Sequence, residues 1–456
     1  MPEHENGPVA ETTAGSGGEA LDPSVAPSTG AEHGATETEL LEPAGAGRAL
    51  AGPTLAEFEA ARERVAGVTR RTPMETSQYL AGVLGSPVHL KCENLQRTGS
   101  YKIRGAVNRL SQLTEEERSR GVVAASAGNH AQGVALAAKE LGLAATIFMP
   151  VGVALPKLQA TKHYGADVVL SGHSVEEALR AARDFAETTG AVFVPPFDHP
   201  DVIAGQGTVG LEILDQVPDV DTIVVPIGGG GLISGIASAV AQATAGTGRT
   251  VRVVGVQVAA AAPFALSMER GERTDVVAGP TIADGIAVAR PGVLNFEIVR
   301  DTVERVVTVE DDDVARALIL MLERAKLVVE AAGAVGVAAV LTGQLRDLGT
   351  TVIVLSGGNI DPLMMERVIG RGLVAAERYL RLRIGMPDRP GQLTRVSEIL
   401  SDAGANVVEV LHTRHGRGLQ ISEVELEISA ETRGPDHVDE VLRRLRDAGY
   451  DPVTDF

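Results

Sequence analysis

The 456-residue sequence has very little cysteine, and this scarcity excludes several kinds of site. Cys92 is the only cysteine, so the chain cannot form an internal disulfide. A zinc site with four cysteine ligands is excluded for the same reason. Proteins that work without disulfides are typical of reducing compartments, so we expect a cytoplasmic localisation.

Positive charge is also scarce, since 41 lysines and arginines stand against 60 aspartates and glutamates, for a net charge of −19. Such an acidic chain is repelled by phosphate backbones and anionic lipids, so we expect neither nucleic acid nor membrane as a partner. Long apolar runs are missing as well, because charges interrupt the stretches rich in Ala, Val and Gly. We also expect no signal or transit peptide, because the N-terminal segment is acidic.

Three regions differ in composition. Residues 1–50 hold nine acidic residues, one arginine and almost no large apolar side chains, so we expect a disordered acidic tail. Residues 51–373 alternate apolar runs with amphipathic stretches and are expected to form the main body. Residues 378–456 have a different pattern, with an alternating strand, helices and a hairpin in a short segment, and are expected to form a separate small domain.

The main body is predicted to be an α/β structure with mostly parallel sheets flanked by helices. Seven apolar runs read as strands, among them "GVVAAS", "TIVVPIGGGG" and "TVIVLSGGN", and helical stretches such as "SVEEALRAARDFAETTG" separate them. Strands that are apolar on both faces and joined by helices favour parallel sheets covered on both sides. We expect a smaller subdomain, roughly residues 88–188, inserted in a larger one.

The C-terminal region reads as strand, helix, two strands and helix. "YLRLRIGM" alternates like a strand, a helix follows Pro390-Gly391, and a hairpin is expected around Gly416-Arg417-Gly418 before the helix "PDHVDEVLRRLRDAGY". This order within fewer than a hundred residues predicts a ferredoxin-like α+β module.

Lys102 is the first candidate for chemistry, in "KCENLQRTGSYKIRGA". It follows a Gly-Ser turn and opens an amphipathic run, whereas most lysines are solvated surface cations. A lysine amine held as an imine with an aldehyde cofactor can exchange with a substrate amine and then act as a base. We therefore interpret Lys102 as a covalent cofactor anchor.

Four consecutive glycines, Gly228, Gly229, Gly230 and Gly231, precede Leu232 between a strand and a helix. Their backbone N–H groups are suited to wrap a phosphate at the helix N-terminus, although a tight turn alone requires one or two glycines. Neither the P-loop nor the G-x-G-x-x-G pattern is present, which disfavours a nucleotide-binding protein.

Two further turns follow apolar strands. "SAGNHAQG" places Ser126, Asn129 and His130 where they would bind a substrate carboxylate or a cofactor oxygen, although turn formation and helix capping are the simpler explanation of Ser126 and Asn129 taken alone. "LSGGN" places Ser356 at a strand end, where its neutral hydroxyl would meet a pyridine nitrogen or merely end the strand.

Together these segments resemble the fold-type II pyridoxal-phosphate enzymes, and most closely their threonine dehydratase and serine racemase branch, over about residues 54–371. The resemblance implies that pyridoxal 5'-phosphate is the cofactor, that Lys102 forms the imine and that Asn129 contacts the phenolic oxygen. It also implies that Gly228 to Leu232 bind the phosphate, that Ser356 faces the ring nitrogen, and that Glu330 lies near the cofactor. Lys102 would then be the catalytic residue, with Ser126, Asn129 and His130 contacting the substrate.

Departures from the racemase pattern favour deamination of L-threonine to 2-oxobutanoate, and of L-serine to pyruvate. Ala127 stands where the racemases have their second acid/base serine. Gln257 and Pro263 stand where the resemblance would place acidic ligands, so we expect no such metal site. A serine racemase or another type II lyase is the alternative within the family.

The C-terminal region resembles an ACT domain through "MPDRPGQL" and "DAGANVVEV". The resemblance implies an amino-acid effector at this ACT domain and a homo-oligomer, dimer or tetramer, although Asp388 and Asn406 are equally explained as capping residues. An amino-acid sensor with a vestigial catalytic body is the alternative from a different class.

Overall fold

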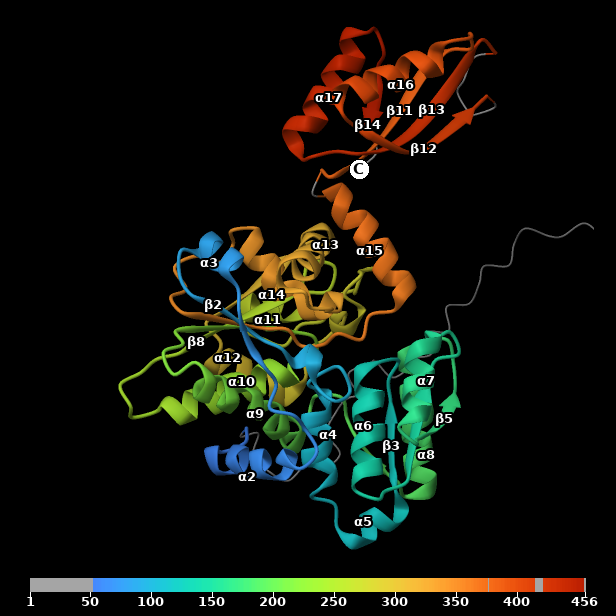
Figure 1. Cartoon of the computed structure of the whole chain (residues 1–456). Coiled ribbons are helices and arrows are strands. Elements are labelled where there is room, and N and C mark those ends of the chain that lie inside the picture. Colours follow the sequence, from blue (N-terminus) through green and yellow to red (C-terminus); the bar gives the residue numbers. More distant parts are fainter. Residues whose placement is uncertain (1–51, 376, 415–420, 455–456) are drawn as a thin grey trace, which may run out of the picture. The chain divides into compact units, whose positions relative to one another are not determined.

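The computed structural model describes residues 52–375, 377–414 and 421–454 (Figure 1). The tail expected over residues 1–50 and the hairpin tip around Gly416–Gly418 lie outside the described residues. The described part contains three sheets with helices packed on them. None of its helices combines the length and apolar composition needed to cross a bilayer.

The largest sheet has six strands in the order β1-β2-β10-β7-β8-β9. All neighbours are parallel except the β1–β2 pair. Its strands are β1 (Met74–Thr76), β2 (Val88–Lys91), β7 (Thr222–Pro226), β8 (Arg252–Val258), β9 (Arg305–Val309) and β10 (Thr351–Val354). Four of them coincide with predicted apolar runs, whereas the edge strands β1 and β9 are partly exposed and lack such a run.

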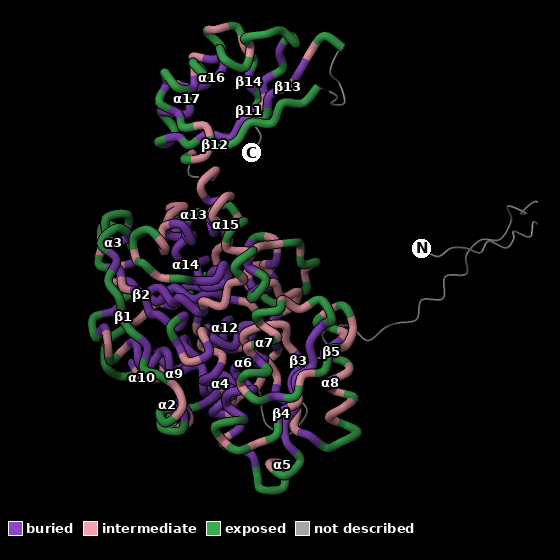
Figure 2. The backbone as a smooth tube through the Cα atoms, turned by 45° about the vertical axis from the view of Figure 1, so that its right-hand side comes forward, coloured by how far each residue is buried: buried purple, intermediate pink, exposed green. Residues whose placement is uncertain are grey.

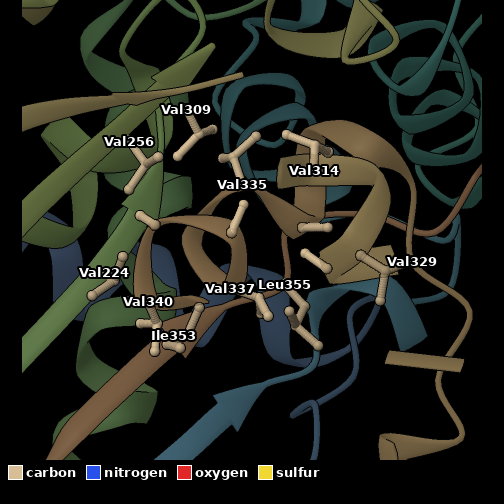
Figure 3. Packing of buried hydrophobic residues seen from close by; sticks show 14 of the residues in the cluster. Val224, Val256, Val309, Val314, Val329, Val335, Val337, Val340, Ile353 and Leu355 are labelled. Atoms are coloured by element: carbon tan, nitrogen blue, oxygen red, sulfur yellow. The ribbon is translucent and has the colours of Figure 1, made fainter. Parts of the chain in front are cut away.

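Side chains of this sheet alternate between two cores. Val224, Val256 and Ile353 point into one core, where α14 (Ala331–Leu341) packs on the sheet with Val335 and Val337 (Figure 3). Neighbouring residues of the same strands face the opposite core. Because both faces are covered, the central strands β7 and β10 are mostly apolar and are buried along their whole length (Figure 2).

Two sets of helices cover these faces. The first face carries α14 together with α3 (Gln78–Leu84), α13 (Asp311–Leu320) and α15 (Pro362–Ala375). The second face carries α9 (Pro200–Gln216), α10 (Gly231–Thr244), α11 (Pro263–Arg270) and α12 (Val293–Thr302), and α2 (Leu55–Ala66) packs on α9. Short turns η1 (Glu93–Leu95) and η2 (Asp284–Ile286) and the π-helical turn η3 (Met321–Ala325) join these elements.

The smaller sheet of the body is parallel, with the order β5-β4-β3-β6. Its strands are β3 (Val122–Ala125), β4 (Ala145–Met149), β5 (Asp167–Leu170) and β6 (Val192–Phe193). Its helices are α4 (Lys102–Leu110), α5 (Glu115–Arg120), α6 (Asn129–Glu140), α7 (Leu155–His163) and α8 (Val175–Thr189). Val122 and Ala124 of β3 pack toward α4 and α6, and Val123 and Ala125 pack toward α8.

The sheet pairing corrects the expected start of the smaller subdomain at about residue 88. Strand β2 pairs with β10 and β1, so residues 88–91 belong to the six-stranded sheet. A boundary based on the order of apolar runs cannot show which sheet a strand joins, because β2 and β10 are brought together only by folding.

The C-terminal domain is an antiparallel sheet of order β12-β13-β11-β14 with two helices. Its elements are β11 (Tyr379–Pro387), α16 (Gln392–Ala403), β12 (Asn406–Thr413), β13 (Glu423–Glu431), α17 (Pro435–Asp447) and β14 (Pro452–Thr454). The predicted order is present, and β14 adds a short strand that the sequence reasoning missed. Leu380, Leu382 and Ile384 alternate inward along β11 and form the core with both helices.

Candidate active site

One cavity of about 280 Å³ lies where the carboxyl ends of β3, β7 and β10 lead into glycine-rich turns. Ligands in parallel α/β sheets bind at this end of the strands. Every residue singled out from the sequence for chemistry lines this cavity, namely Lys102, Ser126, Asn129, His130, Gly228, Gly229, Gly230, Gly231, Leu232, Glu330 and Ser356.

Lys102 is the first residue of α4 and points into the cavity. The turn before it has Gly99 at φ +71°, and the Tyr101 amide donates to the Ser356 carbonyl at 3.2 Å, which ties this turn to the end of β10. Lys102 Nζ donates to the Pro196 carbonyl at 2.8 Å. Burial lowers the pKa of Lys102 to about 8, with Glu330 opposing the shift, so a useful fraction of the amine is neutral near physiological pH.

Arg104, two residues further along α4, anchors this helix and was not singled out from the sequence. Its fully buried guanidinium bonds the carboxylates of Glu93 at 2.8 Å and Glu212 at 2.7 Å. Burial lowers the pKa of Arg104, but the two carboxylates outweigh burial and raise it above its ordinary value. Lys91 completes the cluster through Glu212 at 2.6 Å. The cluster holds the first turn of α4, and therefore Lys102, in place.

The glycine run forms the turn between β7 and α10. Gly230 has φ +100°, and a Cβ on Gly229 would lie 2.3 Å from the Phe197 ring, so side chains are excluded here. The Ile227 amide donates to Val256, and the first α10 bond is the Ser234 amide to Gly230. Among the described residues, no acceptor is found for the amides from Gly228 to Leu232. These N–H groups at a helix N-terminus are therefore available to an anion.

Asn295 and Asp198 support this turn from behind and were also missed. Asn295 Nδ2 donates to the Gly229 carbonyl at 3.1 Å and to Asp198 Oδ1 at 3.3 Å. Asp198 in turn accepts the amides of Val293 and Leu294 at the start of α12. Because Asn295 holds the Gly229 carbonyl on the side away from the cavity, the amides of the glycine turn are favoured to face the cavity. Residue spacing in the sequence carries no signal for these contacts.

The turn from Ser126 to His130 leads from β3 into α6. Ser126 Oγ accepts the Gly128 amide at 3.1 Å, so the turn-forming role is present. His130 Nε2 donates to the Val194 carbonyl at 2.9 Å, and burial, with Lys102 second, lowers its pKa to about 3. The His130 ring is therefore neutral, and Nε2 is not free for a substrate. Its backbone amide, in the first turn of α6, remains available.

Asn129 and Glu330 meet across the cavity wall. Asn129 Nδ2 donates to Glu330 Oε1 at 2.7 Å, and Asn129 Oδ1 accepts from Asn359 at 2.9 Å. Glu330 is the N-cap residue of α14, and burial raises its pKa to about 7, against the hydrogen bond from Asn129. A carboxyl group with this pKa can hold or release a proton near neutral pH.

Ser356 follows β10, two residues after the strand ends at Val354, and is buried, with 4% of its surface exposed. Its hydroxyl has no hydrogen-bond partner among the described residues, although it lines the cavity.

At the sequence position where acidic ligands were considered, Gln257 instead bridges the Ala265 amide and the Ile227 carbonyl. Ala127 also lines the cavity and has no ionisable group.

Together these groups fit a phosphorylated aldehyde. The amides around Gly230 match a phosphate, Lys102 supplies an amine with a lowered pKa, and the free hydroxyl of Ser356 matches a ring nitrogen.

Comparison with known proteins gives the same result. The sequence profile described as "Pyridoxal-phosphate dependent enzyme" matches residues 65–357, and the ACT domain profile matches residues 380–449. The chain is 48% identical over 394 residues to L-threonine ammonia-lyase of Geobacter sulfurreducens, covering 86% of this chain and 97% of that protein.

Two solved structures share the fold of the body. The processed form of threonine deaminase isoform 2 from Solanum lycopersicum is 33% identical, with a TM-score of 0.66 over 74% of this chain and 95% of that chain. Maize serine racemase is 36% identical, with a TM-score of 0.65 over 71% of this chain and 99% of that chain.

Proposed function

Because this chain belongs to the family of pyridoxal-phosphate dependent enzymes, we propose that it is a threonine ammonia-lyase, which converts L-threonine to 2-oxobutanoate and ammonia. The carrying observation is that Lys102, with a pKa of about 8, shares one cavity with the unpaired amides at the start of α10. L-Serine, which also has a β-hydroxyl, is the expected second substrate, giving pyruvate.

The bound cofactor supplies an aldehyde for the substrate amine and a ring that withdraws electrons from the substrate Cα. Lys102 is proposed to hold that aldehyde and, once the substrate amine replaces it, to take the Cα proton at Nζ. The lowered pKa makes this possible, since an ammonium at pKa 10.5 would remain protonated.

The remaining cavity groups position the reactants. The amides from Gly228 to Leu232 are proposed to bind the phosphate, and the Ser356 hydroxyl to meet the ring nitrogen without protonating it. Asn129 would contact the phenolic oxygen, and Ser126 with the first α6 amides would receive the substrate carboxylate. A neutral Ser356 leaves the ring a weak electron sink, which favours rapid loss of the β-hydroxyl.

The absence of an ionisable side chain at Ala127 favours elimination over racemisation. Racemisation needs a donor that returns a proton to the face opposite Lys102. After the β-hydroxyl leaves, the released enamine hydrolyses to the keto acid and ammonia. The structural similarity to maize serine racemase makes racemisation the second candidate.

The C-terminal domain suggests amino-acid binding, because its sequence matches the ACT profile over residues 380–449. We propose that an amino acid regulates the enzyme through this domain and that the enzyme works as a cytoplasmic homo-oligomer. Branched-chain amino acids are the first effectors to test.

The decisive experiment mixes purified protein with L-threonine or L-serine and measures keto-acid release, with and without branched-chain amino acids. Lys102→Ala is expected to lose the visible imine absorbance and to lower kcat by about 10⁴-fold or more. Residual activity near the wild-type rate would contradict the role of Lys102. D-Serine as the main product would favour the racemase, and a protein without imine absorbance would favour an amino-acid sensor.

A further inference from the structure

Lys157 lines the same cavity but has no role in the chemistry described above. Among the lining residues that the structure describes, Lys102 and Lys157 are the only lysines or arginines, whereas Glu176, Asp284 and Glu330 are carboxylates. Under the proposed function, Lys102 would hold the cofactor. An amino-acid substrate therefore brings its carboxylate into a site whose one remaining side-chain cation is Lys157.

The position of Lys157 is adjacent to the turn between β3 and α6. Apart from Gly128 and its own chain neighbours, the only heavy atoms of the described residues within 4 Å of a Cβ placed on Gly128 are Lys157 Nζ at 3.8 Å and Lys157 Cδ at 4.0 Å. The space beside the Gly128 backbone is thus open and bordered by this ammonium. The neighbouring amides of Asn129 and His130 belong to the first turn of α6 and have no intrahelical acceptor.

Lys157 does not serve its own helix. It lies in the first turn of α7, where the helix dipole disfavours a cation and an acidic residue would be more stable. Its side chain is 20% exposed and reaches away from α7 to Asp284 Oδ2 at 3.1 Å. Asp284 comes from η2, so this ion pair joins the two subdomains beside the cavity.

The ion pair is of a kind that another carboxylate can replace. The Asp284 side chain is 72% exposed, and ion pairs with a solvated partner contribute little to the stability of a protein. A substrate carboxylate on the Gly128 side would gain Lys157 and the α6 amides together. Replacing the Asp284 carboxylate by the substrate carboxylate therefore costs little free energy, and the exchange favours the substrate because it contacts both Lys157 and the α6 amides.

We propose that the Lys157 ammonium binds the carboxylate of the amino-acid substrate. In the absence of substrate, Asp284 holds the Lys157 ammonium at the cavity, and the substrate carboxylate then displaces the Asp284 carboxylate. This inference deepens the proposed function and rests on it. Lys157 acts in substrate binding only, since no proton transfer or bond cleavage is assigned to it.

The test compares variants and substrates in the holoenzyme. Lys157→Gln is expected to raise KM for L-threonine about 10- to 100-fold, as loss of a charge-assisted hydrogen bond predicts, with kcat changed less than about threefold. Lys157→Arg retains the charge and is expected to restore most of the affinity. Lys162→Gln removes an exposed lysine from the same helix and should leave KM unchanged. Asp284→Asn removes the competing carboxylate and should lower KM by up to about fivefold.

L-Threoninamide, which lacks the carboxylate charge, separates binding from a structural effect. It is measured as a substrate, or as a competitor of threonine turnover where it does not react. The wild-type preference for threonine over threoninamide is expected to shrink about 10- to 100-fold in Lys157→Gln. An equal loss for both compounds, or an unchanged KM, would overturn the assignment of Lys157 alone. A wild-type enzyme without keto-acid release from threonine would overturn the proposed function and this inference with it.

Discussion

Lys91 and Lys102 lie close together in the sequence, but their surroundings differ in how completely each amine is paired. Lys91 Nζ donates to Thr72 O at 3.1 Å, to Glu212 at 2.6 Å and to Gln216 at 2.8 Å, which uses all three of its hydrogens. Within the described part of the chain, Lys102 Nζ has a single acceptor, the Pro196 carbonyl. Burial lowers the pKa of both amines.

The same contrast separates two regions of the molecule. In the ion cluster around Arg104, each charge has an opposite charge at hydrogen-bond distance, which fixes one arrangement of α4, η1 and α9. In the cavity, the Lys102 amine, the Ser356 hydroxyl and the amides from Gly228 to Leu232 lack a full set of partners among the residues that the structure describes. Unpaired polar groups cost stability, so their concentration in one place indicates that they bind something else.

The largest expected effect concerns the cluster. Arg104→Met removes the ion-pair partner of the buried Glu93 and one of the two partners of Glu212, and should lower the free energy of unfolding by about 3–5 kcal/mol. Denaturant unfolding measures this change. The matched control is Arg62→Met, which breaks an exposed pair with Asp215 and should cost no more than about 1 kcal/mol. If the two variants lose the same free energy of unfolding, the buried cluster is no more important for stability than an exposed ion pair.

A smaller effect is expected from Glu330 and depends on pH. Its pKa of about 7 lies above the ordinary value of 4.5, so between these pH values the folded protein binds more protons than the unfolded chain. Stability of the cofactor-free protein should therefore fall as pH rises from 4.5 to 7, by on the order of 2–3 kcal/mol from this group.

Glu330→Gln keeps an acceptor for Asn129 but cannot titrate, so it tests this dependence directly. The difference in unfolding free energy between wild type and variant should change with pH across this window. A constant difference from pH 4.5 to 7 would show that the carboxyl group titrates normally.

The smallest change in stability is expected at Ser356. Because its hydroxyl has no partner among the described residues, Ser356→Ala should alter the free energy of unfolding by less than about 0.5 kcal/mol. Cofactor affinity should nevertheless fall about tenfold, if the hydroxyl meets the ring nitrogen. Spectrophotometric titration and denaturant unfolding measure the two quantities.

Ser234 is the matched control for Ser356. It is equally buried, but its hydroxyl donates to the Asn295 carbonyl at 3.2 Å. Ser234→Ala should cost about 1 kcal/mol of stability. If Ser356→Ala lowers the free energy of unfolding more than Ser234→Ala does, the Ser356 hydroxyl is not an unpaired group of the cavity.

Local pattern was sufficient for much of the fold. The apolar runs that became β3, β7 and β10 are buried on both faces, so their composition alone indicates central parallel strands. The strands β6 and β9 were not predicted: β6 has only two residues, and the edge strand β9 is partly exposed and begins with a charged residue. The predicted start of the smaller subdomain, at about residue 88, was too early. Strand β2 pairs with β10, which lies far away in the sequence, and local pattern does not show such a pairing.

The sequence by itself pointed to groups that the structure brings to one cavity: a lysine after a Gly-Ser turn, four glycines before a helix, and polar turns after apolar strands. These signals are local, because backbone conformation and capping depend on neighbouring residues. Only the tertiary structure decided what surrounds them. Glu212 lies 108 residues from Arg104, and Asp284 lies 127 residues from Lys157. Such pairs set charge and pKa through proximity in space, which residue spacing does not encode.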